Sequence, residues 1–408
     1  MDEYGNLQIS GVRIVSPTGV LDQATLSIRQ EKILGVEGYA VEAREQNVKH
    51  RTIGVDKRNG GRSLFDDWQG DWLIPGLIDT HVHGAGGADT MDGSIEALAM
   101  IAGTQLRHGT TAFLATTMTS DVKRFQKSLN AVKEFMETAV FEHGAECLGI
   151  HMEGPFISRQ FSGAQKADWI QDASVAALER YQSWSGGNLR ILTLAPEAPN
   201  IERVIRACGK MEVIPSAGHS GASWSEAEKG KDWGIRHVTH GFNAMHPLHH
   251  REPGLIGAAL EDREVFLELI ADGVHVHPSV LGMAYRLKGY ERIILVSDGS
   301  RAVGMVDGEY ELGGQTICVN QKEARLADGT LAGSTASLLD GVRTMLFRIG
   351  VPVHEAVQMA TLVPAKLLGV DKRIGSLEPG KEATFLRLGA DWLLKEIWLR
   401  GSRVMVIT

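Results

Sequence analysis

Short apolar runs alternate with longer amphipathic segments over most of the chain, from about residue 74 to about residue 350. The runs have the length of strands, whereas the segments between them space their apolar residues as a helix does. This alternation is typical of βαβ units around a parallel sheet. Because it recurs at least six times over roughly 300 residues, it favours a closed (β/α)8 TIM-type barrel over an open sheet. The expected strands lie at 110–117, 147–151, 190–195, 212–216, 265–270 and 292–297, and the expected helices at 94–108, 121–142, 201–209, 223–231 and 335–349.

The two ends of the chain have a different pattern from the middle. Turn residues there separate short strands, which we expect at 8–15, 24–28 and 32–36 and, after a return to strand-and-turn sequence, within 375–388 and 394–407. A polar, irregular stretch follows the first group at 43–70. The simplest arrangement is one small β-sandwich domain to which both termini contribute. The predicted boundaries are 74–372 for the barrel, with 1–73 and 373–408 as the two parts of the small domain.

Composition and charge narrow the class of protein. With 43% apolar and 23% charged residues, the chain has the make-up of an ordinary globular protein. A net charge of −8 and the lack of a basic stripe argue against nucleic acid as a partner. The apolar runs are too short for membrane spans, and we expect no signal peptide. Three widely spaced cysteines predict neither a disulfide framework nor a Cys-type zinc site, which favours a reducing, cytoplasmic location.

The first chemical signal is a His-X-His motif, His81-Val-His83, directly after the apolar run 72–78. Side chains alternate along a strand with a period of two, so both imidazoles point to the same face. Such a pair can bind one metal ion from one side. The motif also arises by chance, and alone it is a weak indication of a metal site.

Further candidates follow other expected strands at the point where each strand ends. Individually they have ordinary structural interpretations: Glu153 as an ion-pair partner, His219 as a helix cap, His240 as a core histidine and Asp298 as a turn residue. The carboxyl ends of all strands meet at one face of a barrel, however. Nitrogen and oxygen ligands of this kind suit zinc or iron(II). The shared position, rather than any single residue, predicts a metal site built from His81, His83, Glu153, His219, His240 and Asp298.

Several longer motifs occur in order along the predicted barrel. They are Pro75–Gly84, His151-Met-Glu-Gly-Pro-Phe156, Ala195-Pro-Glu197, Gly218-His-Ser220, His240-Gly-Phe-Asn-Ala-Met245, His250-Arg-Glu-Pro-Gly254, Asp272-Gly-Val-His275, Ser297-Asp298 and Leu331-Ala-Gly-Ser334. Together they resemble the N-acetylglucosamine-6-phosphate deacetylases of the amidohydrolase superfamily. The first motif is common to the superfamily, whereas the His-Met-Glu-Gly-Pro and Asn-Ala-Met motifs are more specific to this branch.

The resemblance implies a role for each candidate. Glu153, His219 and His240 correspond to the principal metal ligands, and His81 with His83 to ligands of a second metal position. One or two divalent ions per subunit, zinc or iron, are therefore implied, with Glu153 able to bridge them. The implied sugar-phosphate binding set is Ala164, Gln165, Asn243, Ala244, Arg251, His275, Leu331, Ala332, Gly333 and Ser334.

Two positions of that set carry further implications. In the family the arginine reaches the site of the neighbouring subunit, so Arg251 implies a homodimer. Gln165 departs from relatives that carry histidine there, and it can form hydrogen bonds but cannot carry charge. This departure bears on substrate preference rather than on the reaction.

The implied reaction is hydrolysis of an acetamide to acetate and glucosamine 6-phosphate, a step of amino-sugar metabolism. A metal-activated water attacks the acetyl carbonyl, and Asp298 corresponds to the general base that then protonates the departing nitrogen.

Three alternatives remain beside this interpretation. In the first, the enzyme acts on N-acetylgalactosamine 6-phosphate or another acylamino sugar phosphate. The second is a cyclic-amide hydrolase or dipeptidase, which commonly uses a carboxylated lysine where this chain offers Glu153. The third is a non-catalytic barrel scaffold, which the retention of all six candidates disfavours. The pathway, amino-sugar salvage or cell-wall recycling, also stays open.

Overall fold

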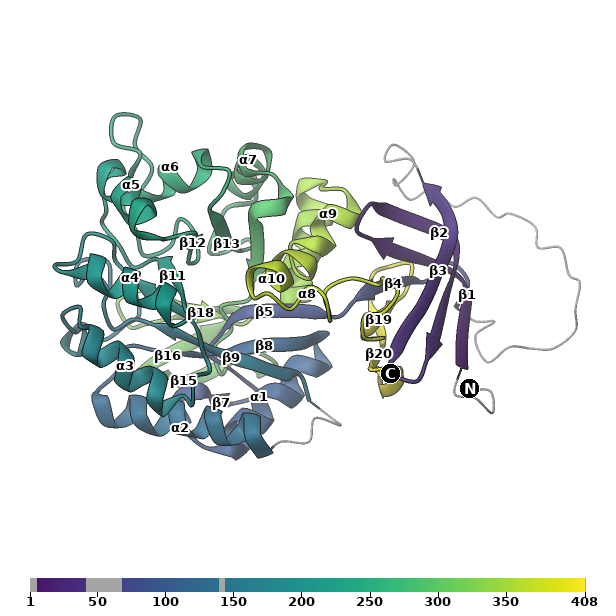
Figure 1. Cartoon of the computed structure of the whole chain (residues 1–408), viewed down its shortest axis with the longest axis horizontal. Helices are drawn as coiled ribbons and strands as arrows, with labels where there is room; N and C mark the ends of the chain where they lie inside the picture. Colours follow the sequence, from purple (N-terminus) through teal and green to yellow (C-terminus); the bar gives the residue numbers. More distant parts are fainter. Residues whose placement is uncertain (1–5, 42–67, 139–143, 408) are drawn as a thin grey trace, which may run out of the picture. The chain divides into compact units, whose positions relative to one another are not determined.

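The computed structural model describes residues 6–41, 68–138 and 144–407 (Figure 1). The predicted irregular stretch at 43–70 lies, up to residue 67, outside the described residues, as do positions 139–142 of the expected helix 121–142. The chain divides into two compact units, one formed by residues 77–349 and the other by residues 1–76 together with 350–408. The sequence instead predicts that the barrel spans residues 74–372.

The larger unit is built around a sheet of eight strands. All neighbouring strands in it run parallel. The sheet closes where Val82 pairs with Gly299, which joins the end of the first strand to the segment after the last. The expected TIM-type barrel is thereby confirmed. Its strands, in hydrogen-bonded order, are β14 (Ile293–Val296), β13 (Phe266–Ile270), β12 (His237–Val238), β11 (Ile214–Ala217), β10 (Leu189–Leu194), β9 (Glu146–Glu153), β8 (Thr110–Thr117) and β5 (Leu77–Val82).

A helix follows each barrel strand in the sequence. Several begin where the sequence places a serine: the side chains of Ser94, Ser174 and Ser223 accept hydrogen bonds from backbone N–H groups three residues ahead. Such caps satisfy donors that a helix start otherwise leaves unpaired. The helices are α1 (Ile95–Arg107), α2 (Val122–Thr138), α3 (Val175–Trp184), α4 (Ile201–Lys210), α5 (Trp224–Trp233), α6 (Gly254–Glu261), α7 (Pro278–Lys288) and α8 (Leu338–Arg343), the last continued by a π-helical segment, Thr344–Ile349.

An antiparallel sheet is inserted between β14 and α8. Its strands are β15 (Gly308–Leu312), β16 (Gln315–Asn320), β17 (Glu323–Arg325) and β18 (Leu331–Ser334). Its inward-facing residues, which include Leu312, Ile317 and Ala332, form a small core with Met118. The motif at 331–334 forms the strand that returns the insertion to the barrel.

The smaller unit contains one seven-stranded sheet to which both ends of the chain contribute. The pairing of β4 with β1 and with β19 joins the two ends, which confirms the expected small β domain. Trp68, Phe385 and Trp398 pack among aliphatic residues in its core. The order is β21 (Ser402–Val406), β20 (Leu394–Leu399), β19 (Phe385–Leu388), β4 (Trp72–Pro75), β1 (Asn6–Ser16), β2 (Gly19–Arg29) and β3 (Lys32–Val41), and the unit also contains α9 (Val353–Gln358) and α10 (Leu362–Leu367).

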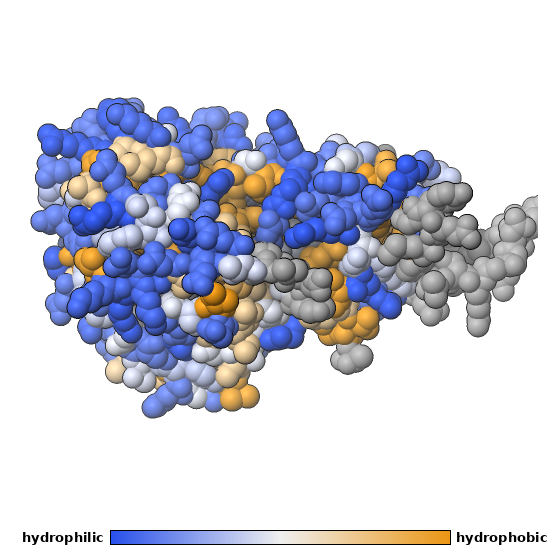
Figure 2. All heavy atoms as spheres, turned by 60° about the horizontal axis from the view of Figure 1, so that its bottom comes forward, coloured by the Kyte–Doolittle hydropathy of each residue, from blue (hydrophilic) through white to orange (hydrophobic). Residues whose placement is uncertain are grey.

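The face drawn in Figure 2 is mostly hydrophilic, with its hydrophobic residues in separate groups. Among the described residues, no helix is both long enough and apolar enough to cross a membrane.

A buried arginine links three strands of the smaller unit's sheet region. Arg387 donates from Nε to Asp71 over 2.8 Å and from Nη1 to Glu396 over 2.7 Å. Its guanidinium also lies over the ring of Trp68, 4.2 Å from the centroid. Both carboxylates are almost fully buried, so their charge depends on this partner.

We therefore expect Arg387→Leu to lower the free energy of unfolding by about 3 kcal/mol, because it leaves buried carboxylates without their main counter-charge. Urea denaturation measures the change. Arg403→Leu is the matched control: Arg403 lies 3.8 Å from the same Glu396, but its side chain is 53% exposed. A surface pair of this kind contributes at most about 1 kcal/mol. Equal losses for the two variants would contradict the assignment.

Candidate active site

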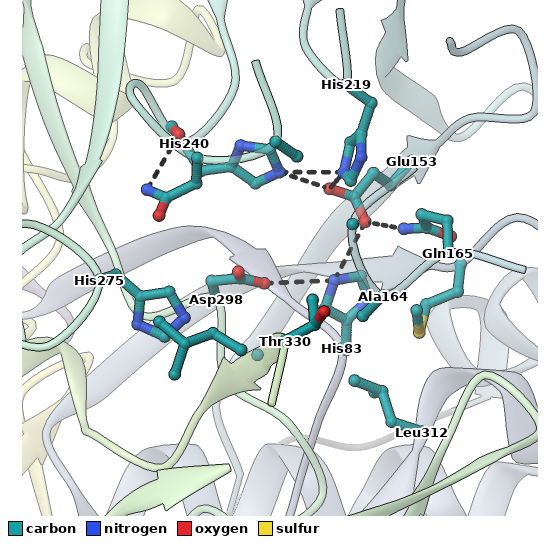
Figure 3. A pocket seen from close by; sticks show the side chains of 16 residues that line it. His83, Glu153, Ala164, Gln165, His219, His240, His275, Asp298, Leu312 and Thr330 are labelled. Carbon is teal, nitrogen blue, oxygen red and sulfur yellow. Dashed lines mark hydrogen bonds and ion pairs between the residues drawn. The ribbon is translucent and has the colours of Figure 1, made fainter. Parts of the chain in front are cut away.

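An open pocket of about 170 Å³ lies among residues that follow the barrel strands and residues of the inserted sheet. Figure 3 shows Glu153 between His219 and His240 on one side and His83 on the other, with Asp298 beside His83. The residues that line the pocket are His83, Met118, Glu153, Gly163, Ala164, Gln165, His219, His240, Asn243, Ala244, His275, Asp298, Leu312, Thr330, Leu331 and Gly333.

One group of candidate metal ligands consists of Glu153, His219 and His240. The Oε1 atom of Glu153 lies 3.0 Å from Nε2 of His219 and 2.9 Å from Nε2 of His240. The two Nε2 atoms are 3.1 Å apart. Three atoms from three different strand ends therefore converge on one point, as the sequence analysis expected of the barrel's carboxyl-terminal face.

A second group consists of His81, His83 and Asp298. Oδ1 of Asp298 lies 3.4 Å from Nε2 of His81 and 3.3 Å from Nε2 of His83. The two groups meet at Glu153, whose Oε2 lies 3.3 Å from Nε2 of His83 while its Oε1 belongs to the first group. Oε1 also lies 3.5 Å from Nε2 of His81, so this carboxylate faces imidazoles of both groups.

The hydrogen bonds of the imidazoles test whether a metal fits here. Nδ1 of His219 lies 3.0 Å from the carbonyl oxygen of Phe161, and Nδ1 of His81 lies 3.1 Å from Glu268. Because these oxygens can only accept, each Nδ1 carries a proton, and in the neutral ring each Nε2 directs a lone pair inward. Lone pairs and carboxylate oxygens this close repel one another unless a cation lies among them. The donor set therefore fits one or two divalent transition-metal ions.

The charges of the site point the same way. Burial raises the pKa of Asp298, but His81 and His83 outweigh this effect and lower the pKa to about 2. Burial likewise raises the pKa of Glu153, yet His219 and His81 hold it well below its usual value. For His81, burial lowers the pKa, but Asp298 and Glu153 raise it to about 9. Both carboxylates are therefore ionised at neutral pH, which favours positive charge beside them.

The backbone at these positions adopts a conformation that most residues avoid. His219, His240, Ala244 and Asp298 have φ values of 46°, 31°, 48° and 48°. Left-handed backbone at a residue with a Cβ costs on the order of 1–2 kcal/mol. At Asp298 two neighbouring segments hold this conformation. The N–H of Asp298 donates to the carbonyl of His81, and the carbonyl of Asp298 accepts from the N–H of Ser334. Strain of this kind concentrates where side-chain direction matters for function.

The residues of the implied sugar-phosphate set fall into two groups. Ala332 is fully buried in the core of the insertion. The backbone of Ser334 forms hydrogen bonds with the backbone of Asp298 and Ser300. Arg251 is exposed, and its guanidinium lies 2.8 Å from His250. None of these three lines the pocket of this chain. The pocket does contain Ala164, Gln165, Asn243, Ala244, His275, Leu331 and Gly333.

Gln165 holds a defined orientation at the pocket wall. Its Oε1 accepts a hydrogen bond of 2.7 Å from the backbone N–H of Thr119, and its Nε2 donates to Oε2 of Glu153. The amide therefore presents N–H groups, and not its oxygen, to the side of the pocket where Glu153 lies.

His275 and His277 lie between β13 and α7, and only the first lines the pocket. Nδ1 of His275 lies 2.7 Å from Asp272, whereas Nδ1 of His277 accepts from the backbone of Ser279 at the start of α7.

Sequence reasoning missed several residues of the site. Met118, Gly163, Leu312 and Thr330 line the pocket but belong to no recognisable motif. Glu268 was also missed, although it carries a signal: it is a lone acid within an apolar strand, and such an acid needs a partner when buried.

Comparisons with known proteins show which family this chain is similar to. A model of the "Amidohydrolase family" matches residues 72–391. The chain is 40% identical to the N-acetylglucosamine-6-phosphate deacetylase of Bacillus subtilis (strain 168), over 78% of this chain and 81% of that protein. It is 35% identical to the N-acetylgalactosamine-6-phosphate deacetylase of Escherichia coli O157:H7, over 96% and 97% of the two chains.

Solved structures show the same relationship. A mutant of the N-acetyl-D-glucosamine-6-phosphate deacetylase of Mycobacterium smegmatis, in complex with N-acetyl-D-glucosamine-6-phosphate, superposes with a TM-score of 0.88. That alignment covers 98% of this chain and all of the other, at 27% identity. On the family match, the sequence similarity and the shared fold together, the chain belongs to the amidohydrolase family, in the branch of the N-acetylglucosamine-6-phosphate deacetylases.

Proposed function

We propose that this protein hydrolyses the acetamide of N-acetylglucosamine 6-phosphate to glucosamine 6-phosphate and acetate. The observation that supports it most directly is the convergence of Glu153, His219 and His240 with Asp298 at one pocket, in a chain of this family. The open pocket admits a substrate of sugar size.

The two groups of ligands would hold one or two divalent ions, zinc or iron(II). Glu153, His219 and His240 are the proposed ligands of the first position, and His81 with His83 those of the second. A bound ion of this kind polarises a carbonyl and lowers the pKa of a coordinated water. Glu153 directs one carboxylate oxygen to each position and is therefore the proposed bridge.

Asp298 is the proposed acid and base. Its carboxylate lines the pocket and is ionised at neutral pH, so it can accept the proton of the attacking water. An amine is a poor leaving group until it is protonated, and the same carboxyl group, now protonated, is placed to supply that proton. His275 and Asn243 line the pocket with hydrogen-bonding groups for the sugar.

A second candidate substrate is N-acetylgalactosamine 6-phosphate. The similarity of this chain to the Escherichia coli protein named for that activity, which extends over 97% of that protein's length, supports this second candidate. The two sugars differ in the configuration of one hydroxyl group.

The decisive measurement is acetate release from each of the two sugar phosphates. We expect kcat/KM to be at least about 10-fold higher for the glucosamine compound, because an unmatched buried hydroxyl leaves polar groups unpaired. Removal of metal with a chelator is expected to abolish both activities, and added zinc or iron(II) to restore them. A reversed ratio would transfer the assignment to the galactosamine compound. Full activity in a protein shown by elemental analysis to contain no metal would refute the mechanism.

Replacing the proposed acid and base tests its role. We expect Asp298→Asn to lower kcat by about 10³-fold, because the amide can neither accept the proton of water nor return it. Asp232→Asn, an exposed acid on α5, is the control and should leave kcat unchanged. Circular dichroism and melting temperature show whether each variant is folded. An Asp298→Asn enzyme with normal turnover would exclude this residue.

Arg251 is proposed to bind the substrate phosphate in the site of a partner subunit. Its exposure and its position outside the pocket of its own chain support an action across a dimer. The guanidinium matches phosphate oxygens in paired hydrogen bonds.

Mixing two inactive variants separates action across the dimer from action within one chain. We expect Arg251→Ala and Asp298→Asn each to be nearly inactive alone, yet co-expression to recover up to about a quarter of wild-type activity. Half of randomly formed dimers are mixed, and each mixed dimer has one intact site. The readout is acetate release from the purified mixed population. If differential tags demonstrate mixed dimers and no activity is recovered, Arg251 acts in the site of its own subunit or has no role in the reaction.

A further inference from the structure

Glu268 is a carboxylate that the proposed mechanism does not use. It lies in β13 between Leu267 and Leu269 and is fully buried, outside the residues that line the pocket. Burying an ionised carboxylate without partners is very unfavourable. Its contacts therefore explain why an acid occupies an otherwise apolar strand.

These contacts come from two other strands and from a strand end. Oε2 of Glu268 lies 3.1 Å from Nδ1 of His81, and Oε1 accepts a hydrogen bond of 3.1 Å from the hydroxyl of Thr80. Oε1 also lies 3.4 Å from Nε2 of His237. The backbone N–H of His240 donates to Oε2 over 3.4 Å. The pKa of Glu268 is about 2, because its histidine neighbours outweigh the effect of burial.

The contact with His81 determines which nitrogen of that ring faces the cation position. A carboxylate beside Nδ1 keeps the proton there and leaves the lone pair on Nε2. That Nε2 lies 3.3 Å from Nε2 of His83 and 3.4 Å from Asp298. Without an acceptor behind it, the ring would be free to rotate or to carry its proton on Nε2, and neither state binds a metal.

The first ligand group is oriented differently. There, Nδ1 of His219 meets the neutral backbone carbonyl of Phe161 rather than a carboxylate. A charged acceptor raises the basicity of an imidazole ligand more than a neutral one does. The two cation positions therefore depend on different acceptors, and a change at Glu268 acts on one position in preference to the other.

We propose that Glu268 is a positioning residue that presents Nε2 of His81 to the second cation and so sets the affinity of the position formed by His81, His83 and Asp298. It acts through His81. Glu268 also forms a group of potential ligands with His81 and His151, but both ring nitrogens of His151 already contact Thr80 and Thr193 and Nδ1 of His81 faces Glu268 itself. The inference rests on the metal-dependent function proposed above and adds the residue that decides whether one or two ions are bound.

The test is a titration of the metal-free protein with Co²⁺, followed by calorimetry and by visible absorption. The wild type is expected to bind two equivalents. In Glu268→Gln, the dissociation constant of the second equivalent should rise about 10- to 100-fold, because glutamine offers one acceptor where glutamate offers two. The first equivalent should change less than about 3-fold, since Phe161 still orients His219. Equal weakening of both equivalents, or of neither, would overturn the proposal, as would a wild type that binds only one.

Four further variants separate positioning from a general loss of stability. His81→Gln should lose the same equivalent, and Glu268→Gln added to it should weaken the second position no further. Glu396→Gln removes a similarly buried carboxylate from the smaller unit and should leave both equivalents unchanged. Thr80→Val retains Glu268 but removes one hydrogen bond to it, and a smaller weakening of the second equivalent alone is expected. This last variant still tests the inference if Glu268→Gln does not fold, and an unchanged second equivalent would count against it.

Acetate release measured on the same samples distinguishes the two proposals. A wild type that binds two equivalents but releases no acetate would refute the proposed function, while the Co²⁺ titration of the variants would still decide the role of Glu268. Normal acetate release together with identical titrations of the wild type and Glu268→Gln would refute only the positioning role.

Discussion

The site depends on the repulsion among negatively charged and lone-pair-bearing atoms that the barrel forces together. Glu153 and Asp298 are both buried and ionised, and imidazole nitrogens face them at 2.9–3.5 Å. No arrangement of these groups is favourable without positive charge among them. The remainder of the unit, from strained backbone at strand ends to the acceptors behind the rings, holds these atoms in place against that repulsion.

The source of this rigidity is the barrel itself. Parallel strands that end on the same face carry their last residues to one place, whatever their distance along the chain. His81 and Asp298 are more than two hundred positions apart, yet the backbone N–H of Asp298 donates to the carbonyl of His81. A metal ligand and the proposed acid and base are thus connected through main chain as well as through side chains. This leaves little freedom for either one to move independently.

A structural feature could be predicted from the sequence when it leaves a regular pattern in the residues near it. His81 and His83 were predictable because a strand has a period of two, and the barrel because strands and helices alternate in a regular way. Glu153, His219 and His240 followed from their position after strands. Glu268 was not recognised, because its role depends on which strands lie near it in the closed barrel, and the local sequence does not show which strands these are. The inserted sheet was missed for a similar reason, since it depends on how the segment after β14 folds back.

The insertion between β14 and α8 has a consequence for how such enzymes diverge. Leu312, Thr330, Leu331 and Gly333 reach the pocket from it, while every proposed metal ligand comes from the barrel. Its hydrophobic core is small and largely its own. These four pocket residues are thereby separated, in the chain and in packing, from the proposed metal ligands. Selection on the insertion can change which acylated sugar is accepted while the hydrolytic centre stays intact, and one catalytic framework can in this way serve several substrates.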